Sequence, residues 1–259
     1  MSWNPSDTTR QITVAVSAVI AIVGSAIGSG AFVGTPIAEA AGGALSATST
    51  LVAPAGPAFS IWSVIYLGFV AYTVWQFLPS QKTNDRHRLL GIPIAITMIL
   101  NAAWILVVQA GVLWLSVAVI AVLLASIAYV FFLMRRVRST DRVDAVVTDG
   151  TMGLYLGWVS VATIANTTAW LVDLGITAGA TSWSVIVLAV AAVIGLFVAV
   201  VGRGRIAPML SIVWGLGWIA QGRLTGELIN TTTGWAAVIA AAIVAVGTVR
   251  ARRVAPAGS

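Results

Sequence analysis

The sequence predicts an all-α membrane protein, a polytopic bundle of about eight transmembrane helices. Of its 259 residues, 59% are hydrophobic and only 8% are charged, whereas soluble globular domains contain roughly 25% charged residues. The apolar residues also gather in stretches of about 20, the length that an α-helix needs to cross a hydrocarbon core of about 30 Å. Because a mean hydropathy of +0.99 is too high for one aqueous domain, lipid is the expected solvent for most of the chain.

Eight stretches approach the length of a membrane span. The last two are the weakest, because the seventh ends among polar residues and the eighth is short and rich in alanine, so seven spans is the alternative. The expected segments are Ile12–Gly34, Phe59–Leu78, Leu89–Gln109, Leu113–Met134, Thr148–Leu171, Ser184–Gly202, Ile206–Leu224 and Trp235–Val249.

The first segment admits a second interpretation as a signal peptide, with Arg10 as its basic flank and residues 38–40 as the cleavage site. Its 23 residues exceed the apolar region of a signal peptide, which is roughly 7–15 residues long, so we expect a helix that belongs to the bundle. Its glycines recur at a spacing that lets another helix approach closely, and we expect this face to pack within the bundle, with a homodimer as the alternative. These glycines are Gly24, Gly28, Gly30 and Gly34.

A connection of 24 residues, 35–58, follows the first segment and is nearly free of charge. Pro54 and Pro57 precede the second segment, where proline suits the start of a helix. A loop of this length is either a loose connector or a lid over a cavity, and its composition alone favours the connector.

Basic residues decide the expected orientation. If the N-terminus is cytoplasmic, 13 of the 14 Lys and Arg residues lie on the cytoplasmic side and only Arg223 does not. Cytoplasmic loops are enriched in these residues, so we expect a multi-pass protein of the inner cell membrane with both termini in the cytoplasm. The net charge of +6 is spread between apolar segments instead of forming one patch, so the expected partner is the lipid bilayer and not a nucleic acid.

Several kinds of chemistry are excluded by composition. The chain has no cysteine and a single histidine, His87, so neither a thiolate site nor a zinc site is expected, and a haem ligated within the membrane is not expected either. The one lysine, Lys82, lies in a loop and cannot form the Schiff base of a retinal pigment. No phosphate-binding loop, catalytic triad or carboxylate pair is present, so we expect neither catalytic residues nor a required cofactor.

Tryptophan is unusually frequent, with 11 residues. Trp3, Trp75, Trp183 and Trp235 lie at segment ends, where indole rings favour the membrane interface. Trp62, Trp104 and Trp158 lie several residues inside a helix. Their companions on the same faces are Tyr66, Asn101 and Asn166, respectively.

Asparagine is costly in the bilayer core unless it is paired. One interpretation of Asn101 and Asn166 is therefore a hydrogen bond between helices. The other is a cavity walled by aromatic rings, in which a few amides orient a flat and mostly apolar ligand. Spacing alone does not decide between them.

Three motifs resemble the TspO/MBR family, the tryptophan-rich sensory proteins related to the translocator protein. The first is the proline-containing loop and helix from Pro54 to Tyr66, followed by Trp75. The second is Leu100-Asn101-Ala-Ala-Trp104, similar to the LNxxW element of the family. The third is Tyr155-Leu-Gly-Trp158-Val-Ser-Val-Ala162-Thr-Ile-Ala-Asn166, similar to its YLxWxxxAxxxN element.

The resemblance covers residues 12–172 and implies a five-helix core over 1–172, with 173–259 as a C-terminal extension of about three helices. Members of the family usually end after five helices, so the chain looks like a longer and divergent branch.

The resemblance also implies a ligand, a porphyrin-like tetrapyrrole or another small planar hydrophobic molecule, in a cavity that opens beneath the first loop on the non-cytoplasmic side. Some members degrade porphyrins photochemically, and that activity is implied by resemblance only. The residues implied to line the cavity are Trp62, Asn101, Trp104, Trp158, Ala162 and Asn166, with Phe59 and Tyr66 nearby and Pro54 shaping the lid.

The last three helices have features of their own. Trp214 and Trp218 are four residues apart beside two glycines, which predicts close packing against the core. Arg223 and Glu227 are also four apart, which predicts an ion pair along the helix. The alternative is that Arg223 contacts an anionic ligand, which a guanidinium suits well.

The expected function is therefore that of a membrane sensor or ligand-handling protein. Two alternatives stay open from the sequence. One is a small secondary transporter, although no convincing internal repeat is present. The other is an accessory subunit of a larger membrane complex.

Overall fold

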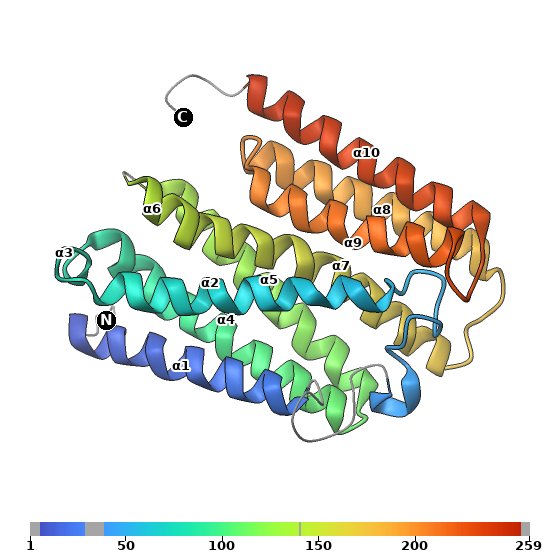
Figure 1. Cartoon of the computed structure of the whole chain (residues 1–259), viewed down its shortest axis with the longest axis horizontal. Helices are drawn as coiled ribbons and strands as arrows, with labels where there is room; N and C mark the ends of the chain where they lie inside the picture. Colours follow the sequence, from blue (N-terminus) through green and yellow to red (C-terminus); the bar gives the residue numbers. More distant parts are fainter. Residues whose placement is uncertain (1–5, 29–38, 140, 255–259) are drawn as a thin grey trace.

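The computed structural model describes residues 6–28, 39–139 and 141–254. Within these residues, eight long helices run side by side as one bundle (Figure 1). They are α1 (Asp7–Gly28), α2 (Ile61–Phe77), α4 (Asp85–Gln109), α5 (Leu113–Arg136), α7 (Thr151–Asp173), α8 (Ala180–Val201), α9 (Ile206–Leu224) and α10 (Thr231–Val254).

Each of the eight expected segments coincides with one long helix. The ends differ because hydropathy falls where polar residues begin, although the helix continues: α1 begins at Asp7 and α10 extends from Thr231 to Val254. Gly30 and Gly34 lie outside the described residues. The structure adds short helices that hydropathy does not reveal, namely η1 (Ala40–Gly43), η2 (Gly56–Ser60), α3 (Pro79–Lys82), α6 (Arg142–Asp144) and the π-helix η3 (Ala145–Gly150).

Six of these helices are long and apolar enough to cross a membrane. Their outer faces expose large apolar side chains such as Leu67, Val193 and Phe197, which lipid covers at low cost. Helices α7 and α9 fall outside this group because each is packed between other helices and uses small and polar residues at the contacts. The protein is a polytopic helical membrane bundle.

Two apolar cores meet at α7. The first lies between α1, α2, α4, α5 and α7 and includes Phe69 and Met98. The second lies between α7, α8, α9 and α10 and includes Leu188 and Leu216. Because α7 contributes to both cores, it joins the helices of residues 1–172 to those of residues 173–259.

The two ends of the bundle differ in charge. Thirteen of the 14 Lys and Arg residues lie near the end that holds α3 and α6, which we call the basic end, and Arg223 lies near the opposite end. At that opposite end, which we call the loop end, the described part of the first loop folds back over the bundle, and Gly111 (φ +73°) makes the turn from α4 to α5.

Small residues set the distance between neighbouring helices. A Cβ added at Gly24 would lie 3.0 Å from the Cβ of Ala102, so the small-residue face of α1 packs on α4 within the bundle. A Cβ at Gly157 would collide with Ser211 Oγ and with the Pro208 carbonyl oxygen of α9. Direct contact of the α7 and α9 backbones therefore requires glycine at position 157.

We expect Gly157→Ala to destabilise the protein by about 1–3 kcal/mol, because the Pro208 carbonyl is held by its own helix and yields little. Gly217→Ala is the matched control, since nothing lies within 4 Å of its added Cβ and alanine favours a helix by up to about 1 kcal/mol. Thermal unfolding of the purified protein in detergent measures both. An equal effect of the two substitutions would contradict the close contact of α7 with α9.

Candidate functional site

An aromatic cluster forms where α2, α4 and α7 meet, and Trp62 is its centre. The Trp62 ring stacks on Tyr66 at a centroid distance of 5.5 Å and on Trp104 at 6.2 Å. It meets the edges of Tyr155 and Trp158 at 6.1 and 6.2 Å. Such offset and edge-to-face pairs are each worth about 0.5–1.5 kcal/mol beyond their burial, so the orientation of the Trp62 indole is fixed by four neighbours.

Helical spacing explains why these rings meet. Phe59, Trp62, Tyr66 and Phe69 recur at intervals of three and four along η2 and α2, so they share one face. Phe59 also meets the edge of Trp158 at 5.8 Å. These four rings form one continuous aromatic face of the helix, and this face points toward α4 and α7.

Both predicted asparagines are fully buried and join helices. The Tyr66 hydroxyl donates to Asn101 Oδ1 at 2.9 Å, and Trp104 Nε1 donates to Asn166 Oδ1 at 3.1 Å. Asn166 also donates to Ser116 Oγ at 2.9 Å. The interpretation as helix-to-helix hydrogen bonds is therefore confirmed by the contacts.

Two buried donors of the cluster have no hydrogen-bond partner among the described residues, Asn101 Nδ2 and Trp158 Nε1. An unsatisfied buried donor costs about 1–3 kcal/mol. Neither residue lines the larger pocket between α1, α2 and α4, and Trp158 borders only a small space beneath the first loop.

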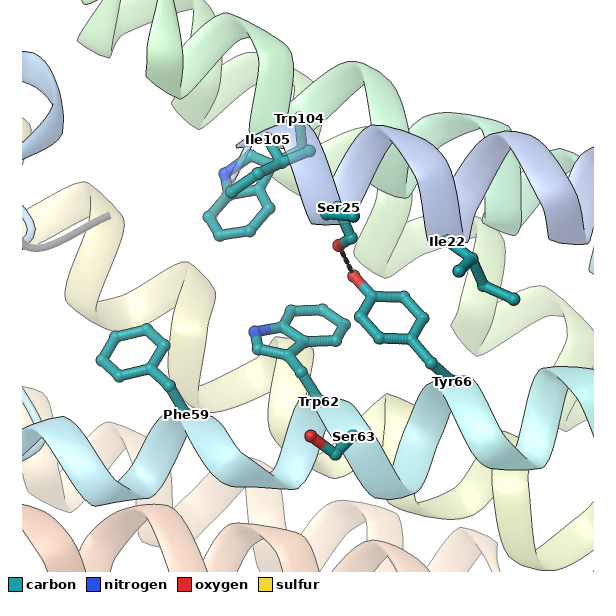
Figure 2. A pocket seen from close by; sticks show the side chains of 9 residues that line it. Ile22, Ser25, Phe59, Trp62, Ser63, Tyr66, Trp104 and Ile105 are labelled. Carbon is teal, nitrogen blue, oxygen red and sulfur yellow. Dashed lines mark hydrogen bonds between the residues drawn. The ribbon is translucent and has the colours of Figure 1, made fainter. Parts of the chain in front are cut away.

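A pocket of about 310 Å³ lies between α1, α2 and α4. Figure 2 shows Phe59, Trp62 and Tyr66 projecting from one helix toward Trp104, with Ser25 hydrogen-bonded to the Tyr66 hydroxyl. The complete lining is Ile22, Ser25, Ala26, Phe59, Trp62, Ser63, Tyr66, Trp104 and Ile105. Ligand pockets typically measure about 300–1,000 Å³, so this one is at the small end of the range. Its indoles, phenol and hydroxyls suit non-covalent binding.

The space beneath the first loop is much smaller, about 30 Å³. Leu45 and Ala53 of the loop and Trp158 of α7 are among the residues that enclose it. It has room for about one or two water molecules. The cavity that the family resemblance places beneath the loop is thus nearly filled, and the larger volume lies beside α1.

The predicted site residues divide between these two spaces. Phe59 and Trp104 line both spaces. Asn101 lines neither, but it accepts the hydrogen bond of the Tyr66 hydroxyl. Trp62 and Tyr66 line the larger pocket only. Pro54, Trp158, Ala162 and Asn166 line the smaller space only.

Sequence reasoning missed the contribution of α1 to the larger pocket. Ser25 lies beside Gly24 in the small-residue stretch that predicts close packing. That spacing shows that α1 approaches a neighbour closely, but it does not identify the neighbour. Ser63 was missed too, because it is exposed and has no aromatic or amide character.

Helix α9 holds the first loop in place. Trp214 Nε1 donates to the Ala58 carbonyl at 2.9 Å, and the Ala55 backbone N–H donates to the Trp218 carbonyl at 3.3 Å. Trp214 and Trp218 meet edge to face at 5.6 Å. The two tryptophans thus pack against the loop that covers the site, as well as against each other.

Arg223 makes a third contact with the loop. The prediction that it forms an ion pair with Glu227 is wrong. Among the described residues no ion pair joins the two, because α9 ends at Leu224 and Glu227 no longer follows the helical repeat. Arg223 is 1% exposed and donates through Nη2 to the Ala47 carbonyl and, at 3.4 Å, to the Ala53 carbonyl. Its Nε and Nη1 have no partner in the part of the chain that the structure describes.

Two of the four tryptophans predicted at the membrane interface are exposed at helix ends. Trp183 and Trp235 are 56% and 60% exposed at helix ends, as expected for a membrane interface. Trp75 is half-buried, and Trp3 lies outside the described residues.

Comparison with known proteins gives one match. A family model described as "TSPO-like protein" matches residues 11–250. The match therefore spans the last three long helices as well as the first five. No curated protein and no solved structure matches the chain.

We expect Arg223→Met to loosen the first loop, because it removes the hydrogen bonds to the Ala47 and Ala53 carbonyls while keeping a long side chain. Thr50, between them, is 5% exposed, and Thr50→Cys would be the only cysteine of the chain. Its reaction with a maleimide should become about tenfold faster or more in the Arg223→Met background, since local opening exposes it. Gln221→Ala, on an exposed face of the same helix, is the control and should leave the rate unchanged; an equal rate in all backgrounds would refute the role of Arg223.

Proposed function

The chain belongs to the TSPO-like protein family, and from this membership we propose that it binds a planar, largely hydrophobic molecule within the membrane. A porphyrin-like tetrapyrrole is the proposed ligand. The proposed role is that of a tryptophan-rich sensor or a ligand-handling protein, without a required cofactor. Membership also means that the chain is a multi-pass membrane protein of the TSPO-like class.

The observation that supports the proposal is the open side of the aromatic cluster. Trp62 borders the 310 Å³ pocket together with Tyr66 and Trp104, the two rings that stack on it, and Tyr155 and Trp158 meet it edge to face. A flat conjugated ligand would lie against aromatic rings that are already oriented, so binding would cost little side-chain entropy. Ser25 and Tyr66 supply polar atoms for the ligand edge.

The pocket also reaches the surface of the bundle. Ser63 lines the pocket and is exposed, and α1 packs mainly on α4 and less on α2. A ligand larger than the enclosed volume would therefore extend between α1 and α2. A molecule dissolved in lipid would reach the pocket from that side.

The distribution of basic residues supports the proposed orientation. Thirteen of the 14 Lys and Arg residues lie at one end, and the positive-inside rule favours a cytoplasmic position for that basic end. We propose the inner membrane as the location, with both termini on the cytoplasmic side. The loop end and the first loop would then face away from the cytoplasm.

Protoporphyrin IX added to the detergent-purified protein should quench tryptophan fluorescence saturably. The double variant Trp62→Ala with Asn101→Ala should bind about tenfold more weakly or worse, because it removes the stacking surface and the support of Tyr66. Trp114→Ala, which removes a 60% exposed indole on α5, is the control. Unchanged binding in the double variant would refute the proposed ligand site.

Single cysteines test the orientation, because the natural chain has none. We expect Asp173→Cys to react with a membrane-impermeant maleimide on intact cells. Arg138→Cys should react only after permeabilisation. The reverse labelling pattern would show the opposite orientation, with the first loop in the cytoplasm.

A further inference from the structure

Polar side chains are buried at the basic end, away from the ligand pocket. We call them the basic-end cluster, and it joins the first turns of α1 and α4 to the last turns of α2 and to the segment before α7. Buried ionisable groups in a membrane bundle are costly and usually have a function. The cluster consists of Arg10, Tyr72, Gln76, Arg86, His87, Asp144 and Asp149.

Arg86 is fully satisfied within the cluster. It forms ion pairs with both Asp144 and Asp149, and its Nε donates to the Val137 carbonyl at 3.0 Å. Asp144 and Asp149 are five residues apart, which in an α-helix would turn them about 140° away from each other. The π-helical turn η3 between them has hydrogen bonds between residues five apart and takes more residues per turn than an α-helix. The two carboxylates therefore come closer to one face, and both reach Arg86.

Several members of the cluster keep buried polar atoms without a hydrogen-bond partner among the described residues, and in His87 both ring nitrogens are of this kind. The His87 side chain is 0% exposed. Its Nε2 lies 3.8 Å from Asp144 Oδ1, and its ring lies 5.8 Å from the ring of Tyr72. A histidine so close to a carboxylate without a hydrogen bond to it is placed to form an ion pair when it gains a proton.

Arg10 is the unpaired cation of the cluster. The aliphatic part of the Arg10 side chain packs on Gly91, since a Cβ added to Gly91 would lie 2.8 Å from Arg10 Cγ. Arg10 Nη2 donates to the Lys82 carbonyl at 2.8 Å. No ion pair involves Arg10 within the described residues. Gly91 is one turn from His87 on the same face of α4, so the Arg10 side chain passes over the face that contains His87. The charged groups that act on His87 are thus Asp144, Arg86 and Arg10, with Tyr72 against its ring.

We propose that His87 is a proton-binding site whose occupancy controls how tightly α1 packs on α4. A proton on His87 creates an ion pair with Asp144, and it also places a second positive charge beside Arg10. Like charges repel strongly where water is excluded. Asp7, the carboxylate that acts on Arg10, is already paired with Arg88 and, within the described part of the chain, forms no ion pair with Arg10. It offsets that repulsion only in part, so the first turns of α1 move away from α4 when His87 is charged.

The proposed control extends to the ligand pocket, and this part rests on the proposed function. The pocket is lined by α1, α2 and α4 only, apart from Phe59 of η2, and these same helices meet at the basic-end cluster. Gln11 and Gln76 also tie α1 to α2 there, through side-chain amides that donate to each other's carbonyls at 2.7 and 3.0 Å. Separation of α1 from α4 would withdraw Ile22 and Ser25 from the ligand, so acid should weaken binding.

The proton site is tested without any ligand, because His87 is the only histidine of the chain. In protein labelled with ¹⁵N-histidine, the imidazole nitrogen signals should change from the neutral to the charged form between about pH 8 and about pH 3. Asp144→Asn should move this change to lower pH and Arg10→Gln to higher pH, each by about one unit or more. Arg88→Gln, on the exposed ion pair with Asp7, is the control with little shift. An imidazole that stays neutral down to acid unfolding, or shifts of the opposite sign, would overturn the proposal.

The coupling is tested by protoporphyrin IX quenching in the wild type and in His87→Gln at the same pH values. Comparison of the two proteins at each pH cancels the ionisation of the porphyrin. Between about pH 8 and about pH 3, the wild type should lose about tenfold more affinity than His87→Gln. Equal losses would overturn the coupling, whereas failure of both proteins to bind at any pH would count against the proposed ligand and leave the NMR titration as the test of the proton site.

Discussion

A hydrogen-bonding group left unpaired in lipid costs several kcal/mol, and this cost determines where the polar side chains of the bundle lie. They pair across helix interfaces. Asn166 of α7 bonds Ser116 of α5, and Ser184 of α8 bonds Thr233 of α10 at 2.6 Å. Each pair fixes the relative rotation and height of two helices, which apolar packing alone leaves loosely defined. The aromatic cluster has one geometry because the helices that supply its rings are held in register by such bonds.

The same constraint explains which parts of the structure the sequence could predict. A run of about 20 apolar residues has few alternatives to a membrane helix, so the eight long helices and the inward direction of Asn101 and Asn166 follow from the sequence. The aromatic face from Phe59 to Phe69 follows from spacing along one helix.

Contacts between helices distant in the sequence could not be predicted in this way. Periodicity shows which face of α1 is buried, but it does not show that Ser25 faces Tyr66. The π-helical turn η3 leaves no mark in hydropathy, because it is defined by backbone hydrogen bonds between residues five apart. Its result, that Asp144 and Asp149 both reach Arg86, could therefore not be predicted either. The ion pair expected between Arg223 and Glu227 failed for a related reason, since spacing along the chain has meaning only while the helix continues.

Helix α9 relates the C-terminal helices to the candidate site. It packs on α7 through Gly157, and it holds the first loop through Trp214 and Arg223. The loop therefore has a fixed position although its own sequence, rich in small residues, is typical of a flexible connector. Helix α9 thus supports, through the first loop, a site whose lining lies within residues 1–172, and the family match likewise extends beyond them to residue 250.

The ligand pocket and the basic-end cluster occupy opposite halves of the same helices, and helix stiffness connects them. Gly24 on α1 touches Ala102 on α4 near the pocket, and Arg10 lies on Gly91 near the cluster. Between these contacts α1 is a continuous helix, and a sharp kink that absorbed a displacement at Arg10 would break backbone hydrogen bonds in lipid. The displacement is therefore transmitted along α1 as a tilt or rotation, and Ser25 of this helix faces the pocket. A charge change in the cluster therefore acts on the pocket mechanically, without any chain of side chains between the two sites.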